Sequence, residues 1–421
     1  MKYLARYTKI WAMVKKDILA HFMMTLIHLV MLIQLKVYMC AGLVASQEVY
    51  MIKVSRGCLG SEELEEVKSA FEYGYFGLAF KVDEFEEALK SYFGASYVVA
   101  TNTGTTALHL ALDALRIGPG DEVIVPSLTF VASFQAISAT GAKPVSCDIH
   151  PDTLLMDVGD VERRLSAKTK AVMPVHYAGN PCDMDALCEL RDRHGFRIVE
   201  DAAHAFGSTY KGKKIGGFGD IVCFSFDSIK TITCGEGGAI ICQDESLDKL
   251  LRNKRLLGME RESQTSSAWK ERGWRYDVTQ QGFRYHMSNI NAAIGLAQLK
   301  KADRFITRRR EICRAYDKAF QEVSCIKKLP IDYNVVAPHI YVVRVLEGRR
   351  DDLGLFLKGR DIETGVAYIP NHFHAFYREE GLLLPETEKV FEEILSLPLH
   401  FEISDEDLRT VIDSVQDFFS A

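Results

Sequence analysis

RIVEDAAHAFGS, residues 197–208, is the stretch that decides the fold, together with CFSFDSIK, residues 223–230. The apolar residues before Asp201 predict a short buried strand that ends at this carboxylate. A second predicted strand, residues 221–226, brings Ser225 and then Lys230 to a similar edge. Because open α/β sheets bind ligands at the carboxyl ends of their strands, the two segments predict a site at one edge of a sheet.

A lysine and a carboxylate at such an edge are what the cofactor pyridoxal 5′-phosphate requires. The lysine amine binds the cofactor aldehyde covalently, and the carboxylate keeps the pyridine nitrogen protonated, so that the ring accepts electrons from a substrate carbanion. We therefore interpret Lys230 and Asp201 as catalytic residues. Each has an ordinary alternative, because an Asp at a strand end often caps a helix and a single Lys is usually solvated.

A phosphate site is predicted after the short strand 97–100, where a loop precedes a predicted helix at residues 107–115. Gly104, Thr105 and Thr106 would hold the phosphate there, since free backbone N–H groups and the helix dipole favour an anion at a helix N-terminus. The alternative is that Thr103 or Thr105 only caps the helix. The glycines of residues 213–219 neither follow a strand nor open a helix with the right spacing, so they predict no dinucleotide site.

Several segments in order along the chain resemble the DegT/DnrJ/StrS family of sugar aminotransferases, which are fold type I enzymes that use pyridoxal phosphate. The matching segments are TGTTAL at 103–108, EDAAHA at 200–205, GD at 219–220, FSF at 224–226, Lys230 with GEGG at 235–238, and NAAIG at 291–295. The resemblance extends from Val54 to Val415.

The resemblance implies an aminotransferase that moves an amino group from an amino acid, glutamate being expected, to the ketone of a nucleotide-linked deoxysugar. It implies a homodimer whose active site lies at the subunit boundary. Lys230 would also shuttle the proton between cofactor and substrate. His204 would approach the phenolic oxygen of the cofactor, Ser225 would contact its phosphate, and Phe130 would cover its ring, although a buried core phenylalanine explains Phe130 equally well.

Three further histidines follow strands or lie in short loops. His176 ends a predicted strand, and we favour a hydrogen-bonded structural role for it. His372 and His400 resemble family positions near the substrate, but histidines in short loops often serve packing alone.

Residue 284 departs from the family pattern. In GFRYHM, residues 282–287, the family usually has Asn at the position of Arg284 and Arg at that of His286. The usual Asn reaches the phosphate of the neighbouring subunit. We expect Arg284 to reach the same oxygens with a charged, bidentate group, and the alternative is a surface arginine.

Alternating strand and helix signals between residues 97 and 257 predict right-handed βαβ units and a mostly parallel sheet. The predicted fold is therefore α/β, with a cofactor-binding large domain at residues 51–305 and a smaller α+β domain at 306–421. Residues 260–280 are polar and predict an excursion from the large domain. The run Arg308–Arg310 is interpreted as the solvated face of a long helix whose apolar positions include Phe305 and Tyr316.

Residues 1–50 form a hydrophobic extension with an uncharged run at 18–35. An upstream start codon, with the enzyme beginning at Met51, is the favoured interpretation. A membrane anchor is second and a signal sequence third, since His21, His28 and Gln34 weaken a bilayer span. A cytoplasmic location is expected, because the ten scattered cysteines suggest neither a disulfide framework nor a zinc site, and no other metal site is predicted.

The net charge of -6 argues against a nucleic-acid partner, because phosphate binding requires clustered Lys and Arg. Three alternatives to the predicted function stay open. A related sugar dehydratase would carry a His in place of Lys230, a second relative would act on an amino acid or cyclitol, and the third is a non-catalytic membrane-associated binding protein.

Overall fold

The computed structural model describes residues 50–260 and 276–420. The extension predicted for residues 1–50 lies almost entirely outside them, as does most of the excursion predicted for 260–280. Within these two ranges, no helix is both long enough and apolar enough to cross a bilayer.

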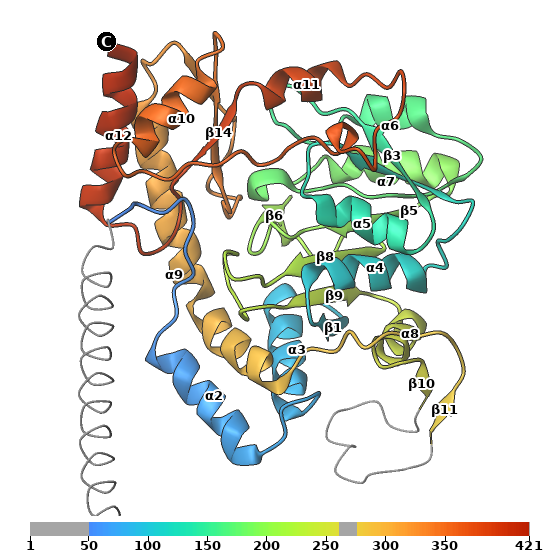
Figure 1. The fold of residues 1–421 in the computed structure, drawn as a ribbon. Helices are drawn as coiled ribbons and strands as arrows, with labels where there is room; N and C mark the ends of the chain where they lie inside the picture. Colours follow the sequence, from blue (N-terminus) through green and yellow to red (C-terminus); the bar gives the residue numbers. More distant parts are fainter. Residues whose placement is uncertain (1–49, 261–275, 421) are drawn as a thin grey trace, which may run out of the picture. The chain divides into compact units, whose positions relative to one another are not determined.

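A seven-stranded sheet forms the centre of the larger part of the molecule (Figure 1). Its spatial order is β1 (Tyr97–Thr101), β9 (Gly238–Cys242), β8 (Ile221–Ser225), β5 (Arg197–Asp201), β4 (Thr169–Val172), β2 (Glu122–Pro126) and β3 (Lys143–Cys147). The strands from β8 to β3 run parallel, whereas β9 is antiparallel to both of its neighbours. The predicted α/β fold with a mostly parallel sheet is confirmed.

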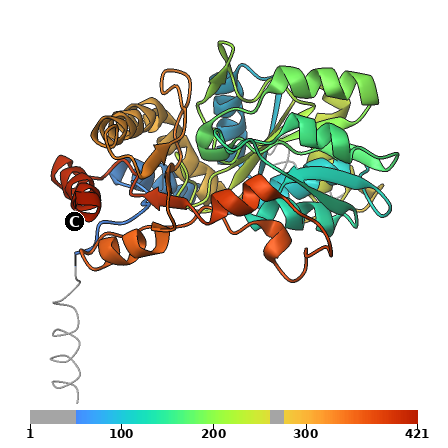
Figure 2. The same cartoon turned by 90° about the horizontal axis from the view of Figure 1, so that it is seen from above.

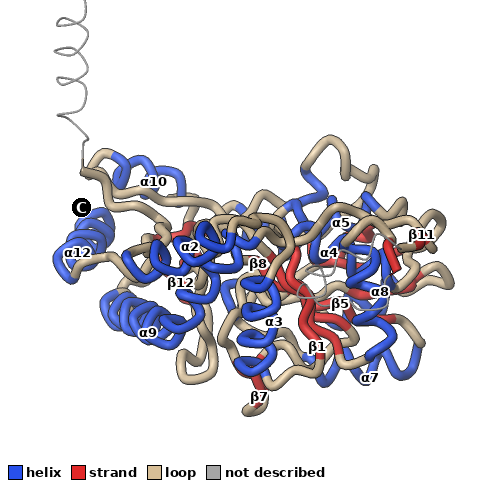
Figure 3. Tube along the Cα trace, turned by 90° about the horizontal axis from the view of Figure 1, so that it is seen from below, coloured by secondary structure: helices blue, strands red, loops and turns tan. Residues whose placement is uncertain are grey.

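Helices cover both faces of this sheet, as Figure 3 shows. One face packs against α4 (Gly104–Ala114), α5 (Val131–Ala139) and α8 (Glu245–Arg255), and the other against α3 (Phe80–Phe93), α6 (Val158–Arg164) and α7 (Met184–His194). Side chains alternate between the two faces, as period-2 strands require. In β1, for example, Val98 packs on the α3 side and Val99 on the α4 side.

A smaller three-stranded antiparallel sheet contains β12 (Ile326–Lys328), β13 (Tyr341–Val345) and β14 (Ile394–Leu397). It shares an apolar core with α10 (Arg350–Lys358), α12 (Asp405–Ser420) and the second half of α9 (Asn289–Ala319). The first half of α9 instead packs against α2 (Ser61–Tyr73) and α3. Because α9 runs through the expected boundary at residue 305, the division into two domains there stays a prediction.

The remaining elements are short. Two-stranded sheets pair β6 (Thr209–Tyr210) with β7 (Lys213–Lys214) and β10 (Met259–Glu260) with β11 (Asp277–Val278). Residues Tyr177–Gly179 and Asn371–Phe373 form the 3-10 turns η1 and η3.

The arginine run in α9 contradicts the predicted solvated face. Arg309 is 2% exposed, and its guanidinium donates hydrogen bonds to the backbone carbonyls of His339 and Leu399 at 3.0 and 3.1 Å. Arg310 donates similarly to the Val336 carbonyl. The helix lies against irregular chain before β13 and after β14, and carbonyls there lack sheet partners. Sequence periodicity cannot reveal such acceptors, so the interpretation was wrong.

Residues 366–391 return from the small sheet across the edge of the large one (Figure 2). Asn371 donates two side-chain hydrogen bonds, to the carbonyls of Ser127 and Thr129. The carboxylate of Asp148, just after β3, accepts hydrogen bonds from the first turn of α11 (Pro385–Phe391). These contacts hold the crossing segment in place, and it carries Tyr368 to the carboxyl ends of the parallel strands.

Candidate active site

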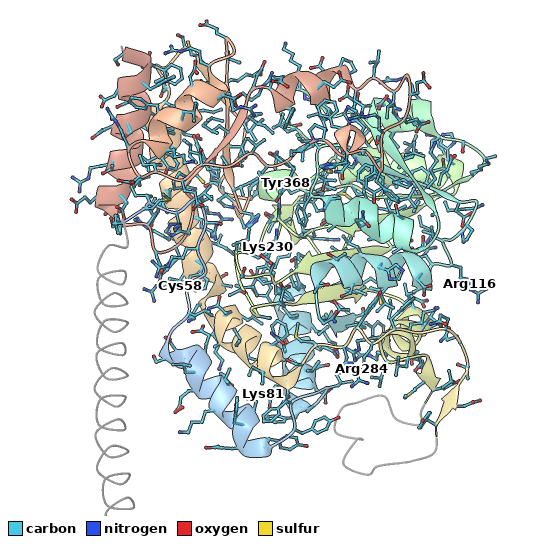
Figure 4. All side chains as sticks on the ribbon, viewed as in Figure 1. Cys58, Lys81, Arg116, Lys230, Arg284 and Tyr368 are labelled. Carbon is cyan, nitrogen blue, oxygen red and sulfur yellow. The ribbon has the colours of Figure 1, made fainter. Side chains whose placement is uncertain are left out.

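A cavity of about 460 Å³ lies at the carboxyl edge of the large sheet. It is lined by residues that follow β5 and β8, by the first turn of α4 and by Tyr368, which is labelled with Lys230 in Figure 4. Seven predicted site residues line it together, namely Gly104, Thr105, Phe130, Asp201, His204, Ser225 and Lys230. Of the remaining two, Thr106 belongs to the capping box of α4, and Arg284 lies outside the cavity lining.

The carboxylate of Asp201 is held from two sides at the end of β5. Ser133 Oγ donates a hydrogen bond to Asp201 Oδ2 at 2.7 Å, and the Ala203 backbone N–H donates to Oδ1 at 3.1 Å. Asp201 is 6% exposed and Ser133 is fully buried. A buried carboxylate with both oxygens bonded has a fixed orientation, as an acceptor for a cofactor N–H requires.

Lys230 projects into the same cavity from the loop after β8. Burial lowers the pKa of its amine, while the carboxylates of Asp201 and Asp227 oppose that shift. Its Nζ atom lies 3.4 Å from Nε2 of His339. A lysine with a lowered pKa is more often the free amine that attacks an aldehyde.

His204 lines the same cavity as Lys230. Its Nε2 shares a hydrogen bond with the hydroxyl of Tyr368 at 2.9 Å, and its buried Nδ1 has no partner among the described residues. Burial and the charge of Lys230 hold the pKa of His204 well below its ordinary value. The imidazole is therefore neutral, and its second nitrogen is buried without a hydrogen bond from the described residues.

The first turn of α4 forms the far end of the cavity. Thr103 is the N-cap, and its hydroxyl accepts the backbone N–H of Thr106 at 3.0 Å. The hydroxyl of Thr106 returns to Asn102 at 2.7 Å, so its side chain belongs to the cap. The N–H groups of Gly104 and Thr105, at the first two helical positions, have no partner within the helix and remain for an anion.

Gly104 makes this arrangement fit a phosphate. A Cβ atom at residue 104 would lie 2.7 Å from the Cβ of Ser225, so only glycine lets the helix meet that serine. The hydroxyls of Ser225 and Thr105 then line the same end of the cavity as the two free N–H groups. Several donors and a helix dipole there suit a dianion.

Burial decides between the alternative roles predicted for Phe130 and for His176. Phe130 is 55% exposed and its ring lies 5.5 Å from that of Tyr368, so the core alternative for Phe130 is wrong. His176 is fully buried, with Nε2 2.9 Å from a Glu200 carboxylate oxygen and Nδ1 accepting the Cys182 N–H. The favoured structural interpretation of His176 is confirmed.

His372 and His400 are both buried outside the cavity lining, among the described residues. His372 Nδ1 lies 2.7 Å from Ser127 Oγ, which fixes the crossing segment to the large sheet. Neither histidine reaches the cavity within this chain.

Arg284 is exposed and outside the cavity lining, in an extended segment that pairs with the end of β1. Its neighbour Tyr285 accepts the backbone N–H of Asn102 at 2.8 Å. Burial, with the positive charges of Arg284 and Arg255, lowers the pKa of His286 to about 4. The segment therefore pairs with the residues just before the first turn of α4. The contact of Arg284 with the cofactor of a partner subunit stays a prediction.

Sequence reasoning missed three residues at the site: Tyr368, which lines the cavity, and Ser133 and His339, which contact Asp201 and Lys230. Ser133 is a small polar residue in the largely apolar stretch 130–139, and Tyr368 follows no strand or motif. His339 precedes β13 rather than following it, so the rule that polar residues gather at strand ends did not apply. Tertiary packing alone brings these three residues to Asp201, Lys230 and His204.

The whole of this architecture matches one family model. The model of the DegT/DnrJ/EryC1/StrS aminotransferase family matches residues 57–416. The chain belongs to this family. It is therefore an aminotransferase that depends on pyridoxal 5′-phosphate, and the family resemblance inferred from the motifs is confirmed.

Solved structures of similar proteins agree with this assignment. The aminotransferase TlmJ from Streptoalloteichus hindustanus is 35% identical, with a TM-score of 0.83, and the match covers 88% of this chain and 99% of TlmJ. The sugar aminotransferase CalS13 from Micromonospora echinospora is 30% identical, with a TM-score of 0.81 and coverage of 87% and 100%. Spr1654 from Streptococcus pneumoniae, in its PLP form, is 31% identical, with a TM-score of 0.82 and coverage of 88% and 99%.

Proposed function

We propose that this aminotransferase acts on the ketone of a nucleotide-linked deoxysugar and takes its amino group from an amino acid, with glutamate as the expected donor. The observation that carries the proposal is the convergence of Lys230, Asp201 and His204 in one cavity with an anion site at its far end. CalS13, which the chain resembles over almost its whole length, is a sugar aminotransferase. The pathway would then supply an amino sugar for a natural product or a surface polysaccharide.

The chain's own residues divide the work. When bound, pyridoxal phosphate supplies an aldehyde and an electron-accepting ring. Lys230 would bind it covalently and, once released, carry a proton between reacting carbons. Asp201, fixed by Ser133, would accept the pyridine N–H and hold that proton in place. Gly104, Thr105 and Ser225 would bind the phosphate, and His204 would meet the phenolic oxygen.

Part of the cavity lining suits a sugar with few hydroxyl groups. Phe130, Ile229 and Tyr368 line the cavity, and the first two are 55% and 39% exposed. Apolar and aromatic surfaces bind the carbon face of a sugar ring, and a methyl group in place of a hydroxyl strengthens that contact. This preference supports a deoxysugar over a fully hydroxylated one.

A panel of keto-sugar nucleotides, each incubated with glutamate, tests the proposal, with formation of the aminated sugar nucleotide as the readout. We expect turnover of at least one keto-deoxysugar nucleotide and none with Lys230→Ala. Turnover of amino-acid or cyclitol ketones alone would instead support the alternative substrate class. Release of a deoxygenated sugar without amination would support the dehydratase alternative, which the lysine at position 230 already disfavours.

A homodimer is part of the proposal. In α2, Leu64 and Phe71 are 72% and 58% exposed, and Tyr75 and Phe76 continue the apolar surface in the next loop. Contiguous exposed apolar surface of this kind marks contact sites. The proposed second copy would bring Arg284 of one subunit to the phosphate end of the other.

The molar mass of the protein, measured by light scattering as it elutes from a size-exclusion column, tests the dimer. A double change, Leu64→Glu with Phe71→Glu, is expected to convert the dimer into monomers. The matched control is Leu355→Glu, because Leu355 is 69% exposed on α10, far along the chain. A wild-type monomer, or a dimer that survives the double change, would contradict this part of the proposal.

A cytoplasmic location also stays within the proposal, supported by the scattered cysteines.

A further inference from the structure

His339 contacts the amine of Lys230 from outside the cavity lining. Its Nε2 lies 3.4 Å from Lys230 Nζ, and the histidine is 2% exposed. Among the described residues, no carboxylate forms an ion pair with Lys230. The neighbour that the amine meets directly is therefore an imidazole.

The backbone fixes the position of this imidazole from two directions. The His339 N–H donates to the Ala178 carbonyl at 3.3 Å, and the His339 carbonyl accepts a hydrogen bond from Arg309 at 3.0 Å. The ring lies against that of His204, with centroids 4.4 Å apart. These contacts fix the backbone of residue 339 and pack its ring against His204, which holds Nε2 beside Lys230, while Nδ1 has no hydrogen-bond partner among the described residues.

The surroundings also fix the protonation state of His339. Burial lowers the pKa of His339 most, and the positive charges of Lys230 and Arg309 lower it further, so that this pKa lies well below its ordinary value. Arg309 is itself buried and has no ion pair among the described residues. His339 is thus a neutral acceptor that cannot keep a proton offered to it.

We propose that His339 is a positioning residue for Lys230, whose Nε2 accepts an N–H of the lysine ammonium while the lysine carries a proton. The proposal rests on the proposed function, in which Lys230 takes a proton from one carbon and returns it to another. An N–H bond forms on Nζ in the first transfer and breaks in the second. His339 gains no proton in either step, so the proton remains on Lys230.

The effect on Lys230 follows from hydrogen-bond strength. A neutral acceptor binds an ammonium more strongly than an amine, so His339 increases the basicity of Lys230. This opposes the effect of burial. The other ionisable groups around Lys230 come from several elements. They are Asp201 at the end of β5, His204 just after it, Asp227 after β8, Tyr368 in the crossing segment and, behind His339, Arg309 of α9.

The test compares two amides that imitate different ring nitrogens. His339→Gln places its side-chain oxygen near the position of Nε2, whereas His339→Asn reaches only the position of Nδ1. The full-length chain freed of cofactor is acetylated with acetic anhydride over a series of pH values, and mass spectrometry gives the extent of reaction at Lys230. Because only the free amine reacts, the midpoint of this curve reports the pKa of Lys230.

We expect wild type and His339→Gln to share one midpoint, and His339→Asn to react at a midpoint lower by about one pH unit, the scale of a hydrogen bond to a charged group. His339→Leu gives the same comparison if the Asn variant does not fold, as judged by circular dichroism. Equal midpoints in all variants, or a Gln variant that shifts as far as Asn, would overturn the proposal.

A second readout uses the loaded enzyme. Loss of kcat with unchanged KM in His339→Asn, and recovery in His339→Gln, is expected of a residue that acts through Lys230. A change in KM alone would assign His339 to substrate binding and would contradict the proposal. The acetylation midpoint needs no sugar substrate, so it distinguishes a failure of this inference from a failure of the proposed function.

Discussion

Ser133 Oγ, in the first turn of α5, donates a hydrogen bond to Asp201 Oδ2 at 2.7 Å. Both residues are buried. The hydroxyl fixes one carboxylate oxygen while the Ala203 N–H fixes the other. Asp201 consequently cannot turn away from a cofactor ring without breaking one of these bonds.

Ser133→Ala should lower kcat by about tenfold or more, because a hydrogen bond to a charged group contributes about 1.5–3 kcal/mol. Ser133→Thr keeps the hydroxyl and is the matched control. Steady-state kinetics with saturating cofactor checks this expectation. An alanine variant as fast as the wild type would mean that Ala203 alone orients the carboxylate.

Asp201→Asn should retain cofactor binding and lose most of the rate, because an amide of the same size cannot stabilise a positive charge on the pyridine nitrogen. Cofactor affinity by fluorescence titration and kcat are measured on the same preparation. If this variant kept full activity, Asp201 would have no part in the mechanism.

Asp201 and Ser133 show which parts of the site could be predicted from the sequence. Asp201 and Lys230 were predictable because each follows a short apolar strand, and parallel strands place such residues at one edge. Ser133 was not, because its place on α5 became meaningful only when that helix packed beside β5. Arg309 shows the same limit in reverse, since a basic run at helical spacing predicts a solvated face until chain from a different sheet supplies buried carbonyls.

Phe130 lies between these cases. Its position after a strand was visible, but the sequence favoured neither a core nor a cavity position. Exposure decided it, and the crossing segment that brings Tyr368 against Phe130 comes from more than two hundred positions further along the chain.

Arg284→Ala should weaken cofactor binding by about 1.5–3 kcal/mol, the scale of a hydrogen bond to a charged group, with little change in folding. The reason is the proposed contact with phosphate oxygens of the partner subunit. Titration of the cofactor-free protein measures the affinity, and Arg116→Ala, at an exposed arginine outside the cavity lining, is the control. Unchanged affinity in the Arg284 variant would return this residue to an ordinary surface role.

The lowered pKa of Lys230 predicts how stability depends on pH. The folded pKa lies below the ordinary value of 10.5, so the folded chain binds fewer protons at this residue than the unfolded chain. The free energy of unfolding should therefore rise as pH increases from the folded pKa toward 10.5. The loss of stability caused by burying the charged lysine is greatest below the folded pKa and disappears above pH 10.5.

Lys230→Met isolates this contribution at pH 7 and above, because His204 and His339, the buried histidines whose pKa the charge of Lys230 lowers, are neutral there in both proteins. We expect the methionine variant, without cofactor, to exceed the wild type in free energy of unfolding at pH 7 and the difference to shrink toward pH 10.5. Urea denaturation at several pH values measures it. A difference that stayed constant with pH would show that the lysine is not desolvated in the folded chain.

The most direct test of the whole account is the site of covalent attachment. The protein loaded with pyridoxal phosphate is reduced with borohydride, digested, and analysed by mass spectrometry for the added cofactor mass. The account predicts the added mass on the peptide that contains Lys230, and its loss from that peptide in Lys230→Ala. Attachment to a different lysine, or no attachment at all, would contradict it.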